Sequence, residues 1–322
     1  MNKDSKIYVA GHKGLAGSAI LDCLKKSDFN NILLRDHKEL ELTDQIATSE
    51  FFKSEKPEYV FLAAAKVGGI QANSLYPADF VYQNISIQTN IIHQSYLSNV
   101  KRLLFLGSSC IYPRDCRQPI KEEYLLTGSL EPTNSPYAVA KIAGIEMCSS
   151  YNHQYNTKYL AAMPTNLYGP GDNYDLQSGH VLAALIRKFA EAKKTNPKSI
   201  EVWGSGKPKR EFLCSTDLAE ACIFLMNLGD EKFNSLLKNV SSENSYPIVN
   251  VGTGEDISIK DLSLLIAKIS EFKGEIIFDN TKPDGAPRKL LNIDILNQLG
   301  WSSNISLSDG ISKALNEFSL TI

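Results

Sequence analysis

The chain has 322 residues, of which 43% are hydrophobic and 22% are charged, and its formal net charge is −2. These values are ordinary for a soluble globular protein and exclude disordered, collagen-like and membrane-spanning chains. The sequence pI of 6.2 gives no basic excess, so a nucleic-acid partner is not expected. Because a single core usually stops growing at about 250–300 residues, the length predicts one large and one smaller domain.

Apolar runs and helical segments alternate through the first half of the chain. We predict strands at 7–10, 31–34, 59–64, 103–106 and 159–163, and helices at 18–26, 84–99 and about 137–155. Continuously apolar strands that alternate with helices indicate a parallel sheet covered on both faces. The predicted fold class is therefore α/β, with a Rossmann-type doubly wound parallel sheet.

After about residue 164 this alternation weakens. We predict a loop at 168–177, a helix at 180–194, a polar surface loop at 236–247 and a strand at 248–251. The expected domains are a dinucleotide-binding one, 1–167 plus about 215–258, and a smaller, mostly C-terminal α/β substrate domain, about 168–214 plus 259–322.

Six cysteines are scattered without a CxxC pair or a clustered histidine. A structural zinc site needs four converging ligands, usually in paired short spacings, so no metal is expected. The N-terminus has no hydrophobic signal region, and the run 60–65 is far shorter than the roughly 20 apolar residues of a membrane helix. We therefore expect a cytoplasmic protein with reduced thiols and no membrane partner.

A glycine-rich loop follows the first predicted strand and opens a helix. Its sequence is GxxGxxG, formed by Gly11, His12, Lys13, Gly14, Leu15, Ala16 and Gly17. The first glycine allows the tight turn, the second lets backbone amides approach a pyrophosphate, and the third permits close packing of helix on strand. This pattern in this context predicts a dinucleotide site.

The end of the second strand bears on the choice between NAD and NADP. NAD-dependent enzymes usually place an acidic residue there, whereas a nearby arginine accommodates a 2′-phosphate. Here Arg35 ends the strand and Lys13 lies in the glycine loop, which favours NADP. Asp36 and His37 complicate this interpretation.

Tyr137 and Lys141 form a YxxxK pair, which on a helix stacks both side chains on one face. A nearby ammonium favours the phenolate, so we expect Lys141 to lower the pKa of Tyr137 from about 10. Such a tyrosine can exchange a proton with a sugar oxygen while a nicotinamide exchanges a hydride with the carbon. Ser108, at the end of an apolar strand, can hydrogen-bond the same oxygen.

These motifs resemble the extended short-chain dehydrogenase/reductase family. The similarity is greatest to the members that convert GDP-4-keto-6-deoxy-D-mannose to GDP-L-fucose by 3,5-epimerisation and 4-reduction. It covers nearly the whole chain, through matching segments at 63–70, 106–113, 132–137, 141–145, 164–170, 202–206, 210–213 and 282–289.

The resemblance implies a role for each catalytic candidate. The C3 and C5 hydrogens of the substrate are acidified by the C4 ketone, and inversion needs a base and an acid on opposite sides. The resemblance assigns the base to Cys110 and the acid to His180. A thiol near a cation can act as a base near neutral pH, and a histidine titrates in that range. Ser108 and Tyr137 would polarise the C4 oxygen.

The resemblance also implies binding residues. Besides the glycine loop, the NADP contacts are Arg35, His37, Leu62, Ala63, Ala64, Leu106, Gly107, Ser108, Lys141, Pro164, Thr165, Asn166, Leu167 and His180. The GDP-sugar contacts are Lys188, Trp203, Arg210 and Asp279. A homodimer formed through the helices at 84–99 and 137–155 is also implied.

Two kinds of alternative stay open. The first is another sugar-nucleotide enzyme: a 4-epimerase, a 4,6-dehydratase, or a 4-reductase acting on another GDP-4-keto sugar such as a deoxy-heptose. A dehydratase commonly has an Asp-Glu pair where this chain has Ser109-Cys110, and a simple reductase would not need both Cys110 and His180. The second is a cofactor-binding sensor without activity, which predicts loss of Ser108, Tyr137 or Lys141; all three are present.

Overall fold

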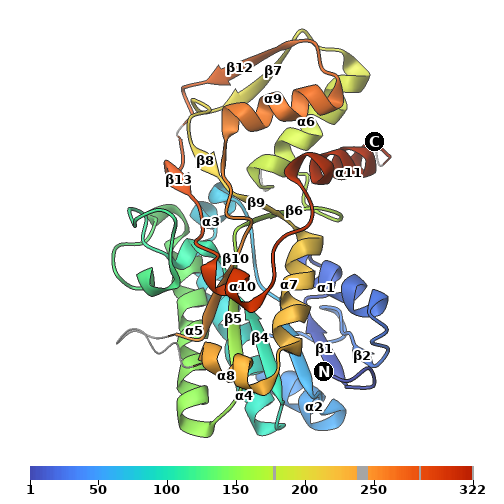
Figure 1. Cartoon of the computed structure of the whole chain (residues 1–322), viewed down its shortest axis with the longest axis vertical. Helices are drawn as coiled ribbons and strands as arrows, with labels where there is room; N and C mark the ends of the chain where they lie inside the picture. Colours follow the sequence, from blue (N-terminus) through green and yellow to red (C-terminus); the bar gives the residue numbers. More distant parts are fainter. Residues whose placement is uncertain (177–178, 238–245, 283, 321–322) are drawn as a thin grey trace.

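A six-stranded parallel sheet forms the centre of the larger part of the molecule (Figure 1). The computed structural model describes residues 1–176, 179–237, 246–282 and 284–320. The strand order is β10-β5-β4-β3-β1-β2. The strands are Ile248–Val251 (β10), Tyr159–Pro164 (β5), Arg102–Leu106 (β4), Tyr59–Leu62 (β3), Ile7–Ala10 (β1) and Ile32–Leu33 (β2). The α/β class and the parallel sheet are thus confirmed, although β2 and β3 are each two residues shorter than predicted.

Both faces of this sheet are buried. Along β1, Ile7 and Val9 point into one core, while Tyr8 and Ala10 point into the core on the opposite face. This alternation follows from the two-residue period of a strand. Because both faces lie against helices, nearly every position of such a strand is apolar, which explains the continuous apolar runs in the sequence.

Helices cover the sheet on both sides. One face packs against α1 (Leu15–Lys26), α7 (Ser215–Asn227), α8 (Asp230–Leu237) and α10 (Asp294–Leu299). The other packs against α2 (Gln45–Glu55), α4 (Pro77–Leu97) and α5 (Ser135–Tyr155), and a short helix, α3 (Ile70–Leu75), precedes α4. In these described ranges, no helix combines the length and apolar content that crossing a membrane requires.

Helix α4 begins seven residues earlier than predicted. Pro77 occupies its first turn, where the missing N–H costs no helical hydrogen bond. Asn84 and Gln88 are buried polar residues that interrupt the apolar spacing. Asn84 exchanges hydrogen bonds with the backbone of Lys66, and Gln88 donates to the Ala140 carbonyl. Tertiary hydrogen bonds therefore replace apolar contacts at these two positions, both of which lie inside the predicted helix.

The smaller part of the molecule has its own core (Figure 1). Helices α6 (Val181–Thr195), α9 (Ile259–Ser270) and α11 (Leu307–Ser319) pack around the parallel pair β7 (Ser199–Trp203) and β12 (Glu275–Asp279). Two small sheets adjoin it: β6 (Asn166–Tyr168) with β9 (Phe212–Cys214), and β8 (Lys209–Arg210) between β11 (Ile257–Ser258) and β13 (Arg288–Lys289).

The second half is more regular than the sequence indicated. The predicted loop at 168–177 starts inside β6, because Tyr168 pairs with Cys214. Of the predicted loop at 236–247, the first two residues end α8 and residues 238–245 lie outside the described residues. The two-domain division stays a prediction; Leu296 of α10 packs in the core of the large sheet.

The order of the strands in the sheet indicates where a crevice lies. From β1 the chain continues to β2 on one side and then to β3 on the other. At such a reversal the connections diverge and leave a crevice at the carboxyl ends of the strands. The residues that follow β1 and β3 therefore face each other at the opening.

A buried polar network joins β10 to the segment that follows β4. Glu122 is 6% exposed and accepts a hydrogen bond of 3.0 Å from the Asn250 amide. Tyr112 donates to Asn250 Oδ1 at 2.6 Å, and Asn250 Nδ2 donates to the carbonyls of Ile120 and Asn292. Burial raises the pKa of Glu122 to about 7.

We expect Glu122→Gln to stabilise the protein increasingly as the pH rises from 5 to 8. The folded carboxyl has the higher pKa, so its stabilising contribution is complete below the unfolded pKa and is lost as the pH rises through 7. Gln keeps the acceptor for Asn250 and removes this loss, which amounts to about 3 kcal/mol at pH 8.

Urea unfolding at pH 5, 6, 7 and 8 measures the difference. Glu50→Gln on α2 provides a control, because Glu50 is exposed and is not among the charges that act on Glu122. A stability difference for Glu122→Gln that is equal at all four pH values would contradict the expectation.

Candidate active site

In the glycine loop, the backbone packs closely against the segment that follows β3 and against the first turn of α1. Gly11 has φ +83°, and a Cβ there would lie 2.6 Å from the Ala64 nitrogen, which follows β3. A Cβ on Gly17 would overlap the Gly11 carbonyl oxygen. Gly14 is the N-cap of α1, so the free amides of the first turn face the crevice. The predicted reasons for the first and third glycines are borne out by these contacts.

A cavity of about 1310 Å³ starts at this loop and continues into the smaller part of the molecule. It is large enough for a dinucleotide together with a sugar nucleotide, since drug-sized ligands occupy roughly 300–1,000 Å³. Nearly every residue predicted for catalysis or binding lines it. The two exceptions are Leu62, which is fully buried in β3, and Asp279 of β12.

The cations near the end of β2 form ion pairs with carboxylates. Lys13 Nζ lies 2.8 Å from Asp36 Oδ2, and Arg35 Nη2 lies 2.6 Å from Glu55 Oε1. Next to them, the buried Nδ1 of His12 has no partner among the described residues. Three features here fit a dinucleotide phosphate: the glycine loop, the N-terminus of α1 and the free ring nitrogen of His12. The cations face carboxylates that a bound phosphate would have to compete with.

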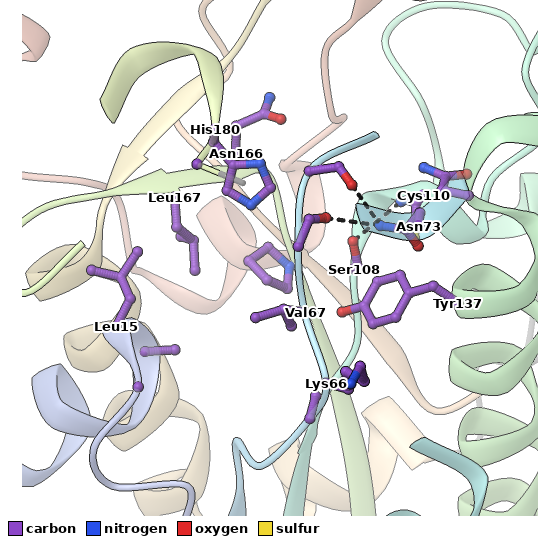
Figure 2. A pocket seen from close by; sticks show the side chains of 18 of the residues that line it. Leu15, Lys66, Val67, Asn73, Ser108, Cys110, Tyr137, Asn166, Leu167 and His180 are labelled. Carbon is purple, nitrogen blue, oxygen red and sulfur yellow. Dashed lines mark hydrogen bonds between the residues drawn. The ribbon is translucent and has the colours of Figure 1, made fainter. Parts of the chain in front are cut away.

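Ser108, Tyr137 and Lys141 meet where β4 ends. Lys141 is 2% exposed, donates to the Leu106 carbonyl at 2.8 Å, and lies 5.8 Å from the centre of the Tyr137 ring. Figure 2 shows Ser108, Cys110 and Tyr137 on one side of the cavity and Asn166, Leu167 and His180 on the other. The sequence spacing thus identified side chains that the fold brings to one place.

The protonation of this pair differs from the expectation. Burial raises the pKa of Tyr137, with the nearby Cys110 adding to the effect, and burial lowers the pKa of Lys141 to about 8. The predicted lowering of the tyrosine pKa was therefore wrong, because loss of hydration on burial dominates the pKa of Tyr137. Tyr137 is held as a neutral phenol that can donate a proton.

Cys110 and His180 lie in the same cavity on different elements. Cys110 is 6% exposed in a short 3-10 turn, and Ser108 Oγ accepts a hydrogen bond of 3.4 Å from its amide. Burial raises the pKa of the thiol, contrary to the simple expectation from a neighbouring cation. His180 is the N-cap of α6, and although it is exposed within the cavity, the surrounding protein lowers its pKa.

The far end of the cavity is cationic and aromatic. Trp203 is 57% exposed, and the ammonium groups of Lys188 and Lys282 lie 6.0 and 5.4 Å from its ring centre. Arg210 donates to the Ala286 carbonyl at 2.6 Å. This combination suits an anionic ligand with a planar group. Asp279 lies beside Trp203 across the β7–β12 pair, outside the lining, with Thr281 as its hydrogen-bond partner.

Sequence reasoning missed several lining residues. Asn73 donates to the Gly68 and Gly69 carbonyls, while its buried Oδ1, like that of Asn134, has no partner in the described part of the chain. These acceptors face a space where ligand hydroxyls could bind. Nothing in the local sequence marks Asn73, whereas Asn134 and Lys289 lie in motifs already singled out, at 132–137 and 282–289. Across the described ranges, no cluster of three His, Cys, Asp or Glu is placed to hold a metal.

Comparisons with known proteins agree with this geometry. The NAD dependent epimerase/dehydratase family matches residues 7–241. GDP-L-fucose synthase 1 of Arabidopsis thaliana is 50% identical over 97% of this chain and 92% of its own length. GDP-L-fucose synthase of Escherichia coli K12 is 50% identical, with 97% and 96% covered. The structure of the Campylobacter jejuni GDP-mannoheptose C4 reductase MlghC with NADP bound has TM-score 0.87 and 42% identity, with 99% of each chain covered.

We expect Gly17→Ala to lower the free energy of unfolding by about 3 kcal/mol, although alanine favours a helix. The reason is that the new methyl group overlaps backbone, which cannot move aside as a side chain can. Gly14→Ala is the matched control, since its Cβ would lie 3.5 Å from the Gly11 carbonyl oxygen. It should cost less than about 1 kcal/mol, through a poorer N-cap. Equal losses in chemical unfolding would refute the steric argument.

Proposed function

The chain belongs to the NAD dependent epimerase/dehydratase family, and we propose that it converts GDP-4-keto-6-deoxy-D-mannose to GDP-L-fucose by NADPH-dependent 3,5-epimerisation and 4-reduction. One observation carries the proposal: Cys110 and His180 line the same cavity as Ser108, Tyr137 and Lys141. The first two suit proton transfer at carbon, and the other three suit chemistry at the ketone oxygen. A bifunctional enzyme needs both sets in reach of one sugar.

The epimerase half uses the acidity of hydrogens next to a ketone. The thiolate of Cys110 removes a proton from C3 or C5, and the negative charge moves to the C4 oxygen. Hydrogen bonds from Ser108 and Tyr137 stabilise that oxygen, since such donors are strongest in a site with little water. His180 returns a proton to the opposite face of the carbon, which inverts it. Its lowered pKa makes the imidazolium a stronger acid.

The reductase half uses the same oxygen contacts. When bound, reduced NADP supplies the hydride for C4. Tyr137 donates its phenolic proton to the C4 oxygen, which its raised pKa permits because the phenol stays protonated at neutral pH. Lys141, fixed by the Leu106 carbonyl, lies near the phenol ring and would also hold the cofactor ribose.

We propose NADP as the cofactor on the cations at the end of β2. Lys13 and Arg35 would bind the 2′-phosphate, with Asp36 and Glu55 giving up part of their present ion pairs. The similar C. jejuni reductase has NADP bound, which supports this assignment. At the other end, Lys188, Trp203 and Arg210 would hold the GDP group, with Asp279 as a further contact from β12.

An alternative follows from the same comparison. The C. jejuni protein is named as a C4 reductase of a GDP-mannoheptose. A GDP-4-keto heptose would make the same contacts with Ser108 and Tyr137, so reduction without epimerisation is the second candidate function. Proton exchange at C3 and C5 distinguishes the two.

We also propose a homodimer formed through α4 and α5. These helices run in the same direction, as shown by the contacts Thr89–Met147 and His93–Tyr151. Their surface exposes apolar side chains that do not line the cavity, namely Ile85, Leu97, Val139 and Tyr155. Apolar patches of this kind commonly mark interfaces. All six cysteines are free, which supports a cytoplasmic location as part of the same proposal.

Incubation with NADPH and GDP-4-keto-6-deoxy-D-mannose in D₂O tests the function. We expect NADPH consumption and one deuterium at each of C3 and C5 in the product, counted by mass spectrometry and NMR. Reduction without deuterium at either carbon would remove the epimerase half and favour the heptose-type reductase. Absence of both reactions would reject the proposal.

Cys110→Ser separates the two halves within this experiment. Loss of a general base typically costs 10²–10⁴-fold, so deuterium uptake should slow by about that factor. Hydride transfer to an already epimerised substrate should change much less. Cys23→Ser is the control. Cys23 lies on α1, packs against the core of the large sheet and does not line the cavity. Equal effects of both variants on uptake would argue against the base assignment.

Ile85→Glu should convert the dimer to a monomer, because it places a charge in the apolar face of α4. Sedimentation velocity at micromolar concentration measures this change. Leu264→Glu alters an even more exposed apolar residue, on α9, and should leave the dimer intact. A wild-type chain that sediments as a monomer would reject the dimer outright.

A further inference from the structure

The mechanism above gives no role to Lys289, a half-buried cation that lines the cavity. It lies on β13, whose register with β8 places it opposite Arg210. Its neighbour Arg288 forms an ion pair with Asp256. Because successive side chains of a strand point to opposite faces, Lys289 points away from Asp256, and it lines the cavity together with Cys110.

The backbone around Lys289 is tied to the segment that follows Cys110. The Leu290 amide donates to Gln118 Oε1 at 2.9 Å, and the Ile120 amide donates to the Leu290 carbonyl at 2.7 Å. The Leu291 amide donates to the buried Glu211 carboxylate at 3.0 Å. These hydrogen bonds hold the strand that carries Lys289 against the segment 118–120, which follows Cys110 in the chain.

The charges around Lys289 leave its ammonium available. It faces Arg210 across the strands, Cys110, Cys116 and Glu131. Glu131 has its own ion pair with Arg114, at 3.5 Å. In the ranges that the structure describes, no carboxylate lies within ion-pair distance of Lys289. Burial lowers the pKa of Lys289, and among the charged groups around it the Cys110 thiol has the largest effect and raises that pKa.

The groups that face Cys110 come from three elements. Burial raises its pKa, and Lys289, the hydrogen bond with Ser108 and Lys141 lower it, in that order. Tyr137 of α5 also lies close enough for its own pKa to be raised by the thiol. Lys141 donates its hydrogen bond to the Leu106 carbonyl. Lys289 is thus the cation with the larger effect on the thiol and has no competing acceptor among the described residues.

We propose that Lys289 is a positioning residue whose ammonium stabilises the thiolate of Cys110 and so makes it a competent base. The inference deepens the proposed function, on which its catalytic meaning rests. The step moves one proton: the substrate carbon gives it to the sulfur, and the positive charge beside the sulfur is left without its anionic partner. Lys289 itself neither gains nor loses a proton.

The pH dependence of Cys110 alkylation tests this without any sugar substrate. The folded protein is treated with iodoacetamide from pH 6 to 10, and the rate is followed on the Cys110 peptide by mass spectrometry. An opposite charge nearby typically shifts a pKa by 1–3 units, so Lys289→Met should raise the midpoint by about one pH unit or more. Lys289→Arg should keep the wild-type midpoint within a few tenths.

Arg288→Met is the matched control, because it removes a cation from the same strand on the face away from the cavity. It should leave the midpoint unchanged. If Lys289→Met does not fold, as seen by circular dichroism, Lys289→Gln serves in its place, with the same expected shift. Equal midpoints in wild type and the neutral variant would overturn the inference.

Deuterium exchange separates this inference from the proposed function. In the neutral variant, exchange at C3 and C5 should be slow at pH 7 and recover as the pH rises, whereas Cys110→Ser should not recover. If the midpoint shifts but the wild-type protein exchanges no deuterium, the thiolate claim stands and the proposed function fails. If exchange is normal and the midpoint does not move, only the role of Lys289 fails.

Discussion

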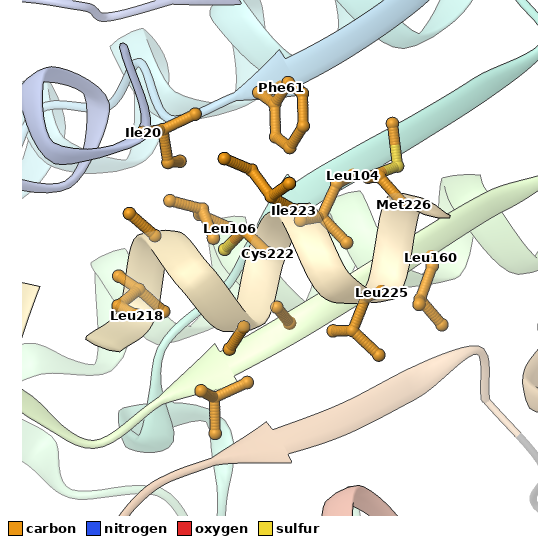
Figure 3. Close-up of a cluster of buried hydrophobic side chains, with 14 of the residues drawn as sticks. Ile20, Phe61, Leu104, Leu106, Leu160, Leu218, Cys222, Ile223, Leu225 and Met226 are labelled. Carbon is orange, nitrogen blue, oxygen red and sulfur yellow. The ribbon is translucent and has the colours of Figure 1, made fainter. Parts of the chain in front are cut away.

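The rest of this structure depends on one constraint: both faces of the parallel sheet must be covered by apolar side chains. Figure 3 shows one result: Leu218, Cys222, Ile223, Leu225 and Met226 of α7 pack against strand residues such as Leu104 and Leu160. With both faces occupied, polar chemistry is confined to the carboxyl edge of the strands. The glycine loop, Ser108 and Cys110 all follow strands at that edge, so the cavity is a consequence of how the sheet is buried.

Burial also sets the chemical character of the candidate catalytic groups. It raises the pKa of Tyr137 and Cys110 and lowers that of Lys141 and His180. All four shifts favour the neutral form, as loss of hydration requires. A site built this way keeps the Tyr137 phenol protonated and makes both charged species costly, the thiolate base and the imidazolium acid. A local cation is therefore of most value beside the thiol.

Sequence could reveal those parts of the fold whose cause is local. Apolar runs marked the central strands, and the spacing of Tyr137 and Lys141 placed both on one helix face. Strands of two residues, such as β8 and β13, are too short to show a periodic pattern. The strand that carries Lys289 could therefore not be predicted as a strand. Ion pairs of Lys13 and Arg35, and the direction of each pKa shift, depend on contacts between distant segments, which one sequence does not display.

The hydrogen bonds between residues 118–120 and 290–292 have a kinetic meaning as well. They join segments about half the chain apart, and such non-local contacts form late because closing a long loop costs entropy first. During synthesis, the glycine loop and its strands leave the ribosome long before β13. The strands β1 to β5 can therefore pair early, whereas the cavity surface formed by β13, like the packing of Leu296 on the sheet, is completed only when the chain is nearly finished.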